Sequence, residues 1–163
     1  MAEVYLALGA NVGDTRANLK KAIDLLGKEV TLSRFSQLYI TRPAGYMEQG
    51  NFMNMAVGGR TDLEPHALLK FVKRIEVEVG RVKRFRNGPR EIDIDIILYG
   101  NTVCKDSELE IPHPRFHERD FVLRPLMDID PSLYHQVLMK TVEQLYSRIS
   151  KEDTFIIACV GDL

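Results

Sequence analysis

The sequence has few cysteines and no long hydrophobic run. Cys104 and Cys159 lack the spacing of a metal-binding motif and are too few for a disulfide framework, which favours a reducing compartment and predicts a cytoplasmic protein. The N-terminal residues lack the basic region of an export signal, and no stretch approaches the ~20 apolar residues of a membrane span. We therefore expect neither export nor membrane anchoring.

An excess of one charge is also absent. The 22 basic and 23 acidic residues give a net charge of -1, which argues against a protein that coats nucleic acid by bulk attraction. Apolar residues make up 45% of the chain, so its 163 residues can bury a core, and the length matches one domain of about 100 to 200 residues. We expect a single domain over residues 1–163.

Hydrophobic patterning predicts alternating strands and helices. Residues 3–8, 30–41 and 52–60 have strand patterns, and a fourth strand lies within residues 88–101. Apolar spacing predicts one helix that starts at Asp14 or Thr15 and stops at Gly27, and a second over residues 65–79.

The resulting order is β-α-β-β-α-β, which predicts an α+β, ferredoxin-like core: an antiparallel sheet with both helices on one face. C-terminal additions follow. We expect a Pro-bounded loop and a short helix in "IPHPRFHERDFVLRPL", a helix over residues 137–149, and an added strand in "TFIIACVG".

The segment "GPREIDIDIILYGN" carries two carboxylates inside an apolar strand. Because side chains alternate along a strand, Asp93 and Asp95 should share one face with Ile97 and Tyr99, while Ile92, Ile94 and Ile96 face the other way. A half-exposed strand with its polar face in water is the simpler reading. The apolar residues after Asp95 argue instead that this face is covered and that the acids border a site.

A basic segment, "RVKRFRNGPR", precedes this strand and contains Arg81, Lys83, Arg84, Arg86 and Arg90 without any acid. Arginine binds phosphate oxygens in bidentate fashion, and paired carboxylates can hold Mg²⁺ against phosphates. Together they suit a nucleoside triphosphate, although a solvated loop or a nucleic-acid patch would explain the basic run alone. The P-loop motif and the protein-kinase motifs are missing, so a different phosphate-handling family is required.

Three motifs, "LALGANVGD", "GPREIDIDIILYGN" and "IPHPRFHERDFVLRPL", identify that family. In their order and spacing the chain closely resembles 6-hydroxymethyl-7,8-dihydropterin pyrophosphokinase of folate biosynthesis over about residues 3–131. The resemblance implies a ferredoxin-like fold and transfer of pyrophosphate from ATP to the pterin hydroxymethyl group, with release of AMP. It implies small-molecule partners, ATP and the pterin, with no nucleic acid and no membrane, and we expect a monomer.

The resemblance also implies roles for individual residues. Two Mg²⁺ ions would lie on Asp93 and Asp95, which together with Arg81 and Arg90 form the catalytic set. The residues implied for ATP binding are Glu76, Arg81, Arg86, Arg90, Ile96, His113 and Arg119. The residues implied for pterin binding are Thr41, Pro43, Ala44, Phe52, Asn54 and Phe121. The chain departs from common family residues at Arg42, Phe52 and Asn87.

Other readings stay open from the sequence alone. His113 lies between two prolines and suits a rigid turn, and Phe121 has apolar neighbours and suits the core. A ferredoxin-like nucleotide- or RNA-binding module without catalysis has the same element order. The strand "NFMNMAVGGR" lacks the spaced aromatics of an RNA-binding motif, which favours the enzyme.

Overall fold

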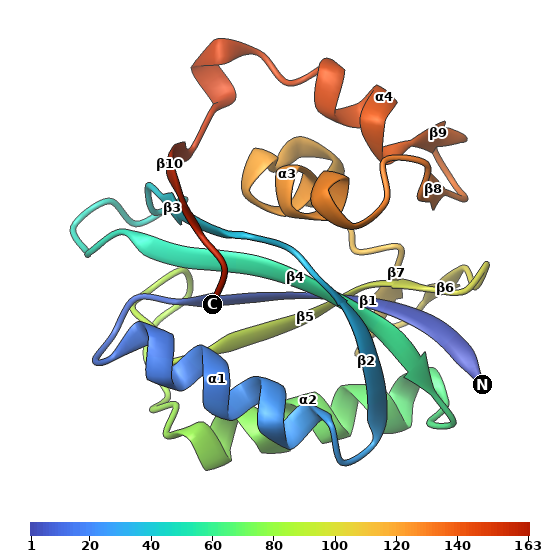
Figure 1. Ribbon diagram of the computed structural model, residues 1–163, viewed down its shortest axis with the longest axis horizontal. Helices are drawn as coiled ribbons and strands as arrows, with labels where there is room; N and C mark the ends of the chain where they lie inside the picture. Colours follow the sequence, from blue (N-terminus) through green and yellow to red (C-terminus); the bar gives the residue numbers. More distant parts are fainter.

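The computed structural model describes residues 1–163, and its centre is a six-stranded antiparallel sheet (Figure 1). The strands are β1 (Ala2–Ala10), β2 (Val30–Phe35), β3 (Leu38–Thr41), β4 (Phe52–Thr61), β5 (Asp93–Tyr99) and β10 (Ile156–Gly161). They are arranged in the order β10-β3-β4-β1-β5, with β2 also paired to β4. This arrangement confirms the predicted ferredoxin-like core and the strand predicted near the C-terminus.

The segment predicted as one strand over residues 30–41 forms two strands. Ser36 interrupts it, because its N–H donates to the Ala56 carbonyl at 2.9 Å while its hydroxyl accepts from the Ala56 N–H at 2.8 Å. One residue thereby satisfies both backbone groups of Ala56, and the ladder restarts at Leu38. The long strand β4 pairs with β2 along one half and with β3 along the other.

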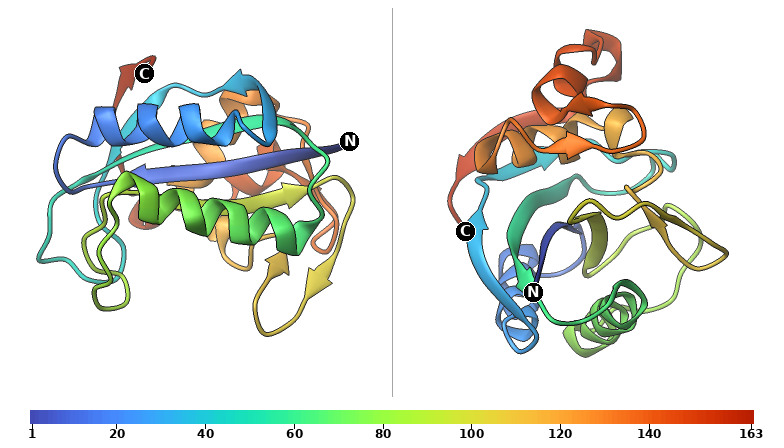
Figure 2. Two further views of the ribbon diagram at one scale, coloured as in Figure 1. Left: turned by 90° about the horizontal axis from the view of Figure 1, so that it is seen from below. Right: turned by 90° about the vertical axis from the view of Figure 1, so that its right-hand side faces the viewer.

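The two predicted helices cover one face of the sheet (Figures 1 and 2). Helix α1 (Thr15–Leu26) begins after Asp14, whose carboxylate accepts the Ala17 N–H at 3.1 Å. Helix α2 (Pro65–Val79) begins with a proline in its first turn and ends at Gly80, which has φ of 116°. That left-handed conformation suits glycine and stops the helix at the position predicted from the sequence.

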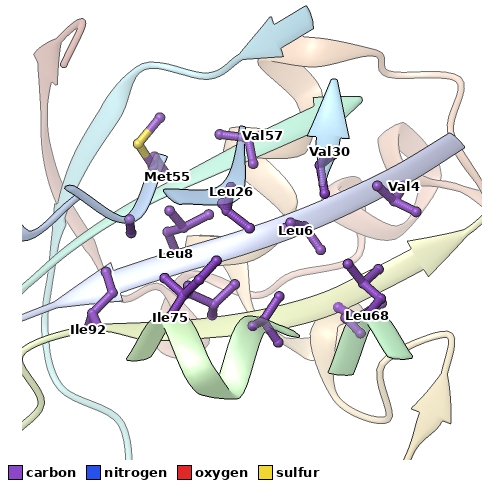
Figure 3. Packing of buried hydrophobic residues seen from close by; sticks show 14 of the residues in the cluster. Val4, Leu6, Leu8, Leu26, Val30, Met55, Val57, Leu68, Ile75 and Ile92 are labelled. Atoms are coloured by element: carbon purple, nitrogen blue, oxygen red, sulfur yellow. The ribbon is translucent and has the colours of Figure 1, made fainter. Parts of the chain in front are cut away.

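The main core lies between these helices and the sheet (Figure 3). Every second residue of β1 from Val4 to Ala10 points into it and is fully buried or nearly so. Leu26 of α1 and Leu68 of α2 meet these side chains from the helical face. Burial contributes about 1.5 to 3 kcal/mol for each such side chain, so this layer fixes the sheet on which the site is built.

The C-terminal part of the chain covers the opposite face of the sheet. Helix α3 (Asp120–Ile129) and helix α4 (Val142–Ser147) lie there, preceded by a short 3-10 helix, Phe116–Glu118 (Figure 1). Phe116 is fully buried in a second apolar cluster formed against this face. Within the ferredoxin-like core, the two helices α1 and α2 lie on one face of the sheet, as predicted. The added helices α3 and α4 lie on the other face. None of the helices is both long enough and apolar enough to cross a membrane.

The predicted helix over residues 137–149 is wrong in its first half. Residues 134–141 form a hairpin of β8 (Tyr134–His135) and β9 (Lys140–Thr141), and Met139 has φ of 56°, which is incompatible with a right-handed helix. Thr141 then starts α4 through a capping box with Gln144. Three further short elements are β6 (Cys104–Lys105), β7 (Glu110–Ile111) and a 3-10 turn, Lys151–Asp153.

Strand β5 contains a bulge that changes the predicted face of one residue. The pairing with β1 moves from Leu6 opposite Ile96 to Tyr5 opposite Leu98, which leaves Ile97 as the extra residue. Ile97 packs in the second cluster, on the face predicted for it, but Tyr99 packs against the main core. The prediction for Tyr99 is therefore wrong, because strict alternation ends at the bulge.

Candidate active site

A pocket of about 90 Å³ opens where β1 ends and β4 and β5 begin. Its floor is the sheet, and its walls are two loops, residues 42–51 and 80–92, and the start of α3. The sequence-predicted residues that line it are Thr41, Ala44, Phe52, Asn54, Arg90, Asp93, Asp95, Arg119 and Phe121. The fold therefore brings both parts of the predicted site, the acidic and basic part and the aromatic part, to one place.

Small residues on β1 create room in front of the acids. Asp95 pairs in register with Ala7, and Asp93 pairs with Gly9. Directly opposite residues in an antiparallel pair share a face, so neither carboxylate meets a bulky neighbour across the strand. Both carboxylates line the pocket as a result.

The two acids differ in their charge environment. Asp93 accepts Arg81 Nη1 at 3.1 Å and lies 3.0 Å from Arg90 Nη1, so two guanidinium groups neutralise it. Asp95 forms no ion pair within 4.0 Å. Its burial, and then the charge of Asp93, raise the pKa of Asp95 to about 7.

This donor set fits a hard divalent cation. Mg²⁺ prefers carboxylate oxygens together with water and phosphate, and it stabilises the ionised form of an acid that has no ion-pair partner. Asp95 is such an acid, and Asp93 lies two residues away on the same face of β5. The residues present are therefore those that a magnesium ion requires.

Glu76 lies beneath the acid pair and is 3% exposed. Its carboxylate accepts the Ile94 N–H at 2.8 Å and lies 2.9 Å from Arg81 Nη1. Burial raises its pKa, and the hydrogen bond from Ile94 opposes that shift. Glu76 holds Arg81 against Asp93 and fixes β5 to α2, so its place in the structure is that of a positioning residue.

The basic loop is joined to the neighbouring loop over the pocket. Asn11 connects them, because its amide nitrogen donates to Gln49 at 2.9 Å and its amide oxygen accepts the Arg90 N–H at 2.8 Å. Tyr46 of one loop contacts Phe85 of the other edge to face, with ring centroids 4.8 Å apart. These contacts are not predicted from the sequence, although Asn11 belongs to the motif "LALGANVGD".

The amide of Asn54 forms the polar part of the cleft. Its nitrogen donates to the Thr41 hydroxyl at 2.7 Å, and its oxygen lies over Gly9. A β-carbon at Gly9 would be 2.4 Å from that oxygen, so only glycine leaves the amide in place. This is a physical reason for the glycine in the motif "LALGANVGD".

Phe52 and Phe121 supply the aromatic part, and both line the pocket. Phe121, at the start of α3, contacts Phe155 edge to face at 5.6 Å, and the Arg119 guanidinium lies 5.6 Å from the Phe121 ring. The Phe121 side chain is only partly buried, so it is not simply a core residue.

The C-terminal segment supports this wall of the site. The Arg42 guanidinium donates to the Thr154 carbonyl and lies 5.4 Å from the Phe155 ring. The buried Asp120 accepts the N–H groups of Phe155 and Ile156 at 2.9 to 3.0 Å. Neither contact was predicted, because residues 154–156 lie more than 30 positions from Asp120 in the sequence.

Six predicted residues do not line the pocket: Glu76 and Arg81, which lie behind Asp93 as described above, and four others. Ile96 is 5% exposed in the main core, on the face of β5 opposite the acids, so only its backbone can reach a nucleotide. Pro43 is buried, and Arg86 is exposed without an ion pair. His113 lines a neighbouring cavity beside Pro112, and burial together with the charge of Arg119 lowers its pKa to about 4. His113 is therefore a neutral group at physiological pH.

Comparisons with known proteins agree with the family resemblance of the sequence motifs. Residues 5–131 match the family model of 7,8-dihydro-6-hydroxymethylpterin-pyrophosphokinase (HPPK). A 2-amino-4-hydroxy-6-hydroxymethyldihydropteridine pyrophosphokinase of Aquifex aeolicus is 42% identical over 88% of this chain and 90% of its own length. The similarly named protein of Bacillus subtilis is 39% identical over 91% of this chain and 90% of its own length.

Other relatives are longer proteins. Folic acid synthesis protein FOL1 of Dictyostelium discoideum is 49% identical over 87% of this chain, but the match spans only 22% of FOL1. The solved structure of wild-type HPPK-DHPS from Plasmodium falciparum has a TM-score of 0.73 at 17% identity, covering 90% of this chain and 43% of that one. That likeness shows the fold. The family match and the near full-length relatives show that this chain belongs to the 7,8-dihydro-6-hydroxymethylpterin-pyrophosphokinase family.

Proposed function

We propose that the protein transfers a pyrophosphoryl group from ATP to the hydroxymethyl group of 6-hydroxymethyl-7,8-dihydropterin and releases AMP, in folate biosynthesis. The observation that carries this proposal is the convergence of an acid pair, an arginine-rich loop and an amide beside two aromatic rings in one pocket. The first two suit a triphosphate, and the third suits a flat heterocycle with hydrogen-bonding edges. Membership of the pyrophosphokinase family supports the same assignment.

In this proposal Asn54 and Thr41 bind the edge of the pterin ring, and Phe52 and Phe121 bind its faces. An amide can donate and accept at once, which suits a ring edge that carries both kinds of group. Thr41 accepts from Asn54, so the orientation of the amide is set before the ligand arrives. The hydroxymethyl group would then point along the cleft toward the acids.

Arg81 and Arg90 bind the triphosphate. Both guanidinium groups contact Asp93 in the structure, so they are held within a few ångströms of the acid pair. Phosphate oxygens are negatively charged, as Asp93 is, and so offer both arginines a second partner. Arg119 adds a further cation from the start of α3. Arg86 and His113 remain proposed ATP contacts, the latter as a neutral hydrogen-bonding group.

Asp93 and Asp95 would hold two Mg²⁺ ions, which would neutralise charge on the phosphates and ease loss of the alcohol proton. Positioning and charge neutralisation supply most of the catalysis in phosphoryl transfer, so neither aspartate has to act as a strong base. ATP and the pterin are the proposed partners of a cytoplasmic, monomeric, single-domain enzyme.

The binding-module alternative is not favoured. An RNA-binding module of this topology uses the sheet face opposite its two helices. Here α3 and α4 cover that face, and residues such as Tyr5 and Ala56 are buried beneath them. Nucleic acid therefore has no access to the part of this face that α3 and α4 cover.

The reaction can be tested by product analysis. Incubation with ATP, Mg²⁺ and the reduced hydroxymethylpterin should release AMP in a one-to-one ratio with consumed pterin. Release of ADP would exclude pyrophosphoryl transfer. Asp95→Asn should remove AMP release, and Cys159→Ser, a change at an exposed cysteine outside the pocket, is the matched control.

A further inference from the structure

A second group of metal-ligating side chains lies outside the active site. His66 is in the first turn of α2, and Cys104 and Asp106 are in and next to β6. One ligand atom from each residue, imidazole nitrogen, thiol sulfur and carboxylate oxygen, lies within 4.8 Å of the other two. Cys104 has no metal-binding spacing in the sequence, and only the fold brings a histidine from 38 positions away to it.

The three side chains need only small movements to bind one metal ion together. His66 Nε2 and Asp106 Oδ2 are 2.6 Å apart, and Cys104 Sγ is 4.0 Å from the same carboxylate oxygen. In tetrahedral zinc sites the metal lies about 2.0 to 2.3 Å from each ligand, which places neighbouring ligand atoms roughly 3.3 to 3.8 Å apart. The histidine and the aspartate would separate by roughly 0.7 to 1.2 Å, and both side chains are close to 40% exposed and can move.

The other carboxylate oxygen is already fixed. Asp106 Oδ1 accepts the N–H groups of Glu108 and Leu109 at 2.8 and 2.9 Å, so the carboxylate presents Oδ2 to His66 and Cys104. The sulfur itself has no close partner, since its nearest oxygens are at 4.0 Å. A thiolate, an imidazole and a carboxylate form a borderline-soft ligand set that favours zinc over magnesium.

We propose that His66, Cys104 and Asp106 bind a zinc ion, with water as the fourth ligand, and that this ion fastens the β6–β7 hairpin to the start of α2. Binding replaces the hydrogen bond between His66 and Asp106. The thiol proton passes to solvent, and the imidazole binds the ion through Nε2 as the neutral ring with its proton on Nδ1, so the proton that Nε2 donated to Asp106 also leaves that nitrogen. The site is separate from the catalytic acids. Glu76 lies beside these acids, and His66 is ten residues before Glu76 on the same helix, which is a distance of about 15 Å.

Cobalt is the probe that reports sulfur ligation, because a thiolate bound to Co²⁺ adds a charge-transfer absorption that oxygen ligands at Asp93 and Asp95 cannot produce. The untagged, reduced full-length chain should show this absorption with one equivalent of Co²⁺, and Zn²⁺ should remove it. Cys104→Ser should abolish the absorption, whereas Cys159→Ser, a change at the other cysteine, should leave it unchanged.

Asp106→Asn provides a second variant, since an amide oxygen can still accept from Glu108 and Leu109 and keep the turn. It should weaken cobalt binding by ~10-fold or more, and Zn²⁺ should raise the melting temperature of the unmodified chain but not of this variant. Absence of the absorption in the unmodified chain, or its persistence in Cys104→Ser, would overturn the proposal.

Discussion

Asp95 should destabilise the metal-free protein at neutral and alkaline pH, so Asp95→Asn should abolish activity and at the same time raise stability. The carboxylate has no ion pair, and burial and the charge of Asp93 disfavour its ionised form. Asparagine is similar in shape and carries no charge. An active-site residue that costs stability in the absence of its ligand is a common trade-off between stability and activity.

The magnitude follows from the pKa. An ordinary pKa of 3.8 becomes about 7 in the folded protein, and each unit corresponds to 1.36 kcal/mol, which gives an upper bound of about 4 kcal/mol. Because the folded-state pKa is raised, the folded protein binds the extra proton, and stability falls as pH rises from about 4 to about 7. Above pH 7 the ionised Asp95 lowers the free energy of unfolding by this full amount. At pH 5 the loss is smaller by roughly 2.7 kcal/mol.

Urea unfolding in EDTA measures this directly at pH 8 and pH 5. The stability difference between Asp95→Asn and the unmodified chain should favour the variant at pH 8 and shrink at pH 5. Taking the difference cancels the titration of all other groups. Excess Mg²⁺ should then stabilise the unmodified chain more than the variant.

Asp93→Asn is the matched control, and it should lower the free energy of unfolding where Asp95→Asn raises it. Asp93 neutralises Arg81 and Arg90, so its loss leaves Arg90 without an ion pair and Arg81 with Glu76 alone, and it should destabilise the protein by about 1.5 to 3 kcal/mol. If Asp95→Asn were less stable at pH 8, or if its effect did not depend on pH, the argument from the charge environment would be refuted.

Three further substitutions test other contacts. Gly9→Ala should weaken pterin binding by about tenfold in calorimetry, because its β-carbon would displace the Asn54 amide; unchanged affinity would contradict the assigned role of that amide. Asp120→Ala should lower the free energy of unfolding by about 1 to 3 kcal/mol, since two N–H groups lose their buried acceptor; a neutral effect would show that the C-terminal segment does not depend on it. Phe121→Leu should weaken pterin binding about 2- to 10-fold with ATP affinity unchanged, and equal losses for both ligands would argue for a purely structural role.

The regular part of the fold could be predicted from the sequence because its signals are local. The apolar stripe of α2 and the left-handed glycine at its end determine that helix within 16 residues. The strand break at Ser36 and the bulge at Ile97 could not be predicted, because each depends on which backbone group of a neighbouring strand is available. The helix predicted over residues 137–149 is wrong over residues 137–141 for a similar reason, since the apolar residues of this part of the hairpin resemble a helical stripe.

The site shows the same division. The acid pair and the basic loop were recognisable as charge patterns in the sequence, and the structure places Asp93, Asp95 and Arg90 in one pocket. Contacts between distant segments were not recognisable, including those that Asn11 makes with two loops and those that Asp120 makes with the last strand. Sequence patterns identify which chemical groups are present, whereas only the fold shows which partners they meet.

The central claim is that Asp93 and Asp95 present magnesium to a bound triphosphate. A crystal structure with Mg²⁺ and a non-hydrolysable ATP analogue tests it most directly. The account predicts electron density for cations bridging these two carboxylates and the phosphate oxygens, with Arg81 and Arg90 moved from Asp93 toward the phosphates. Cations bound elsewhere, with both arginines still paired to Asp93, would contradict it.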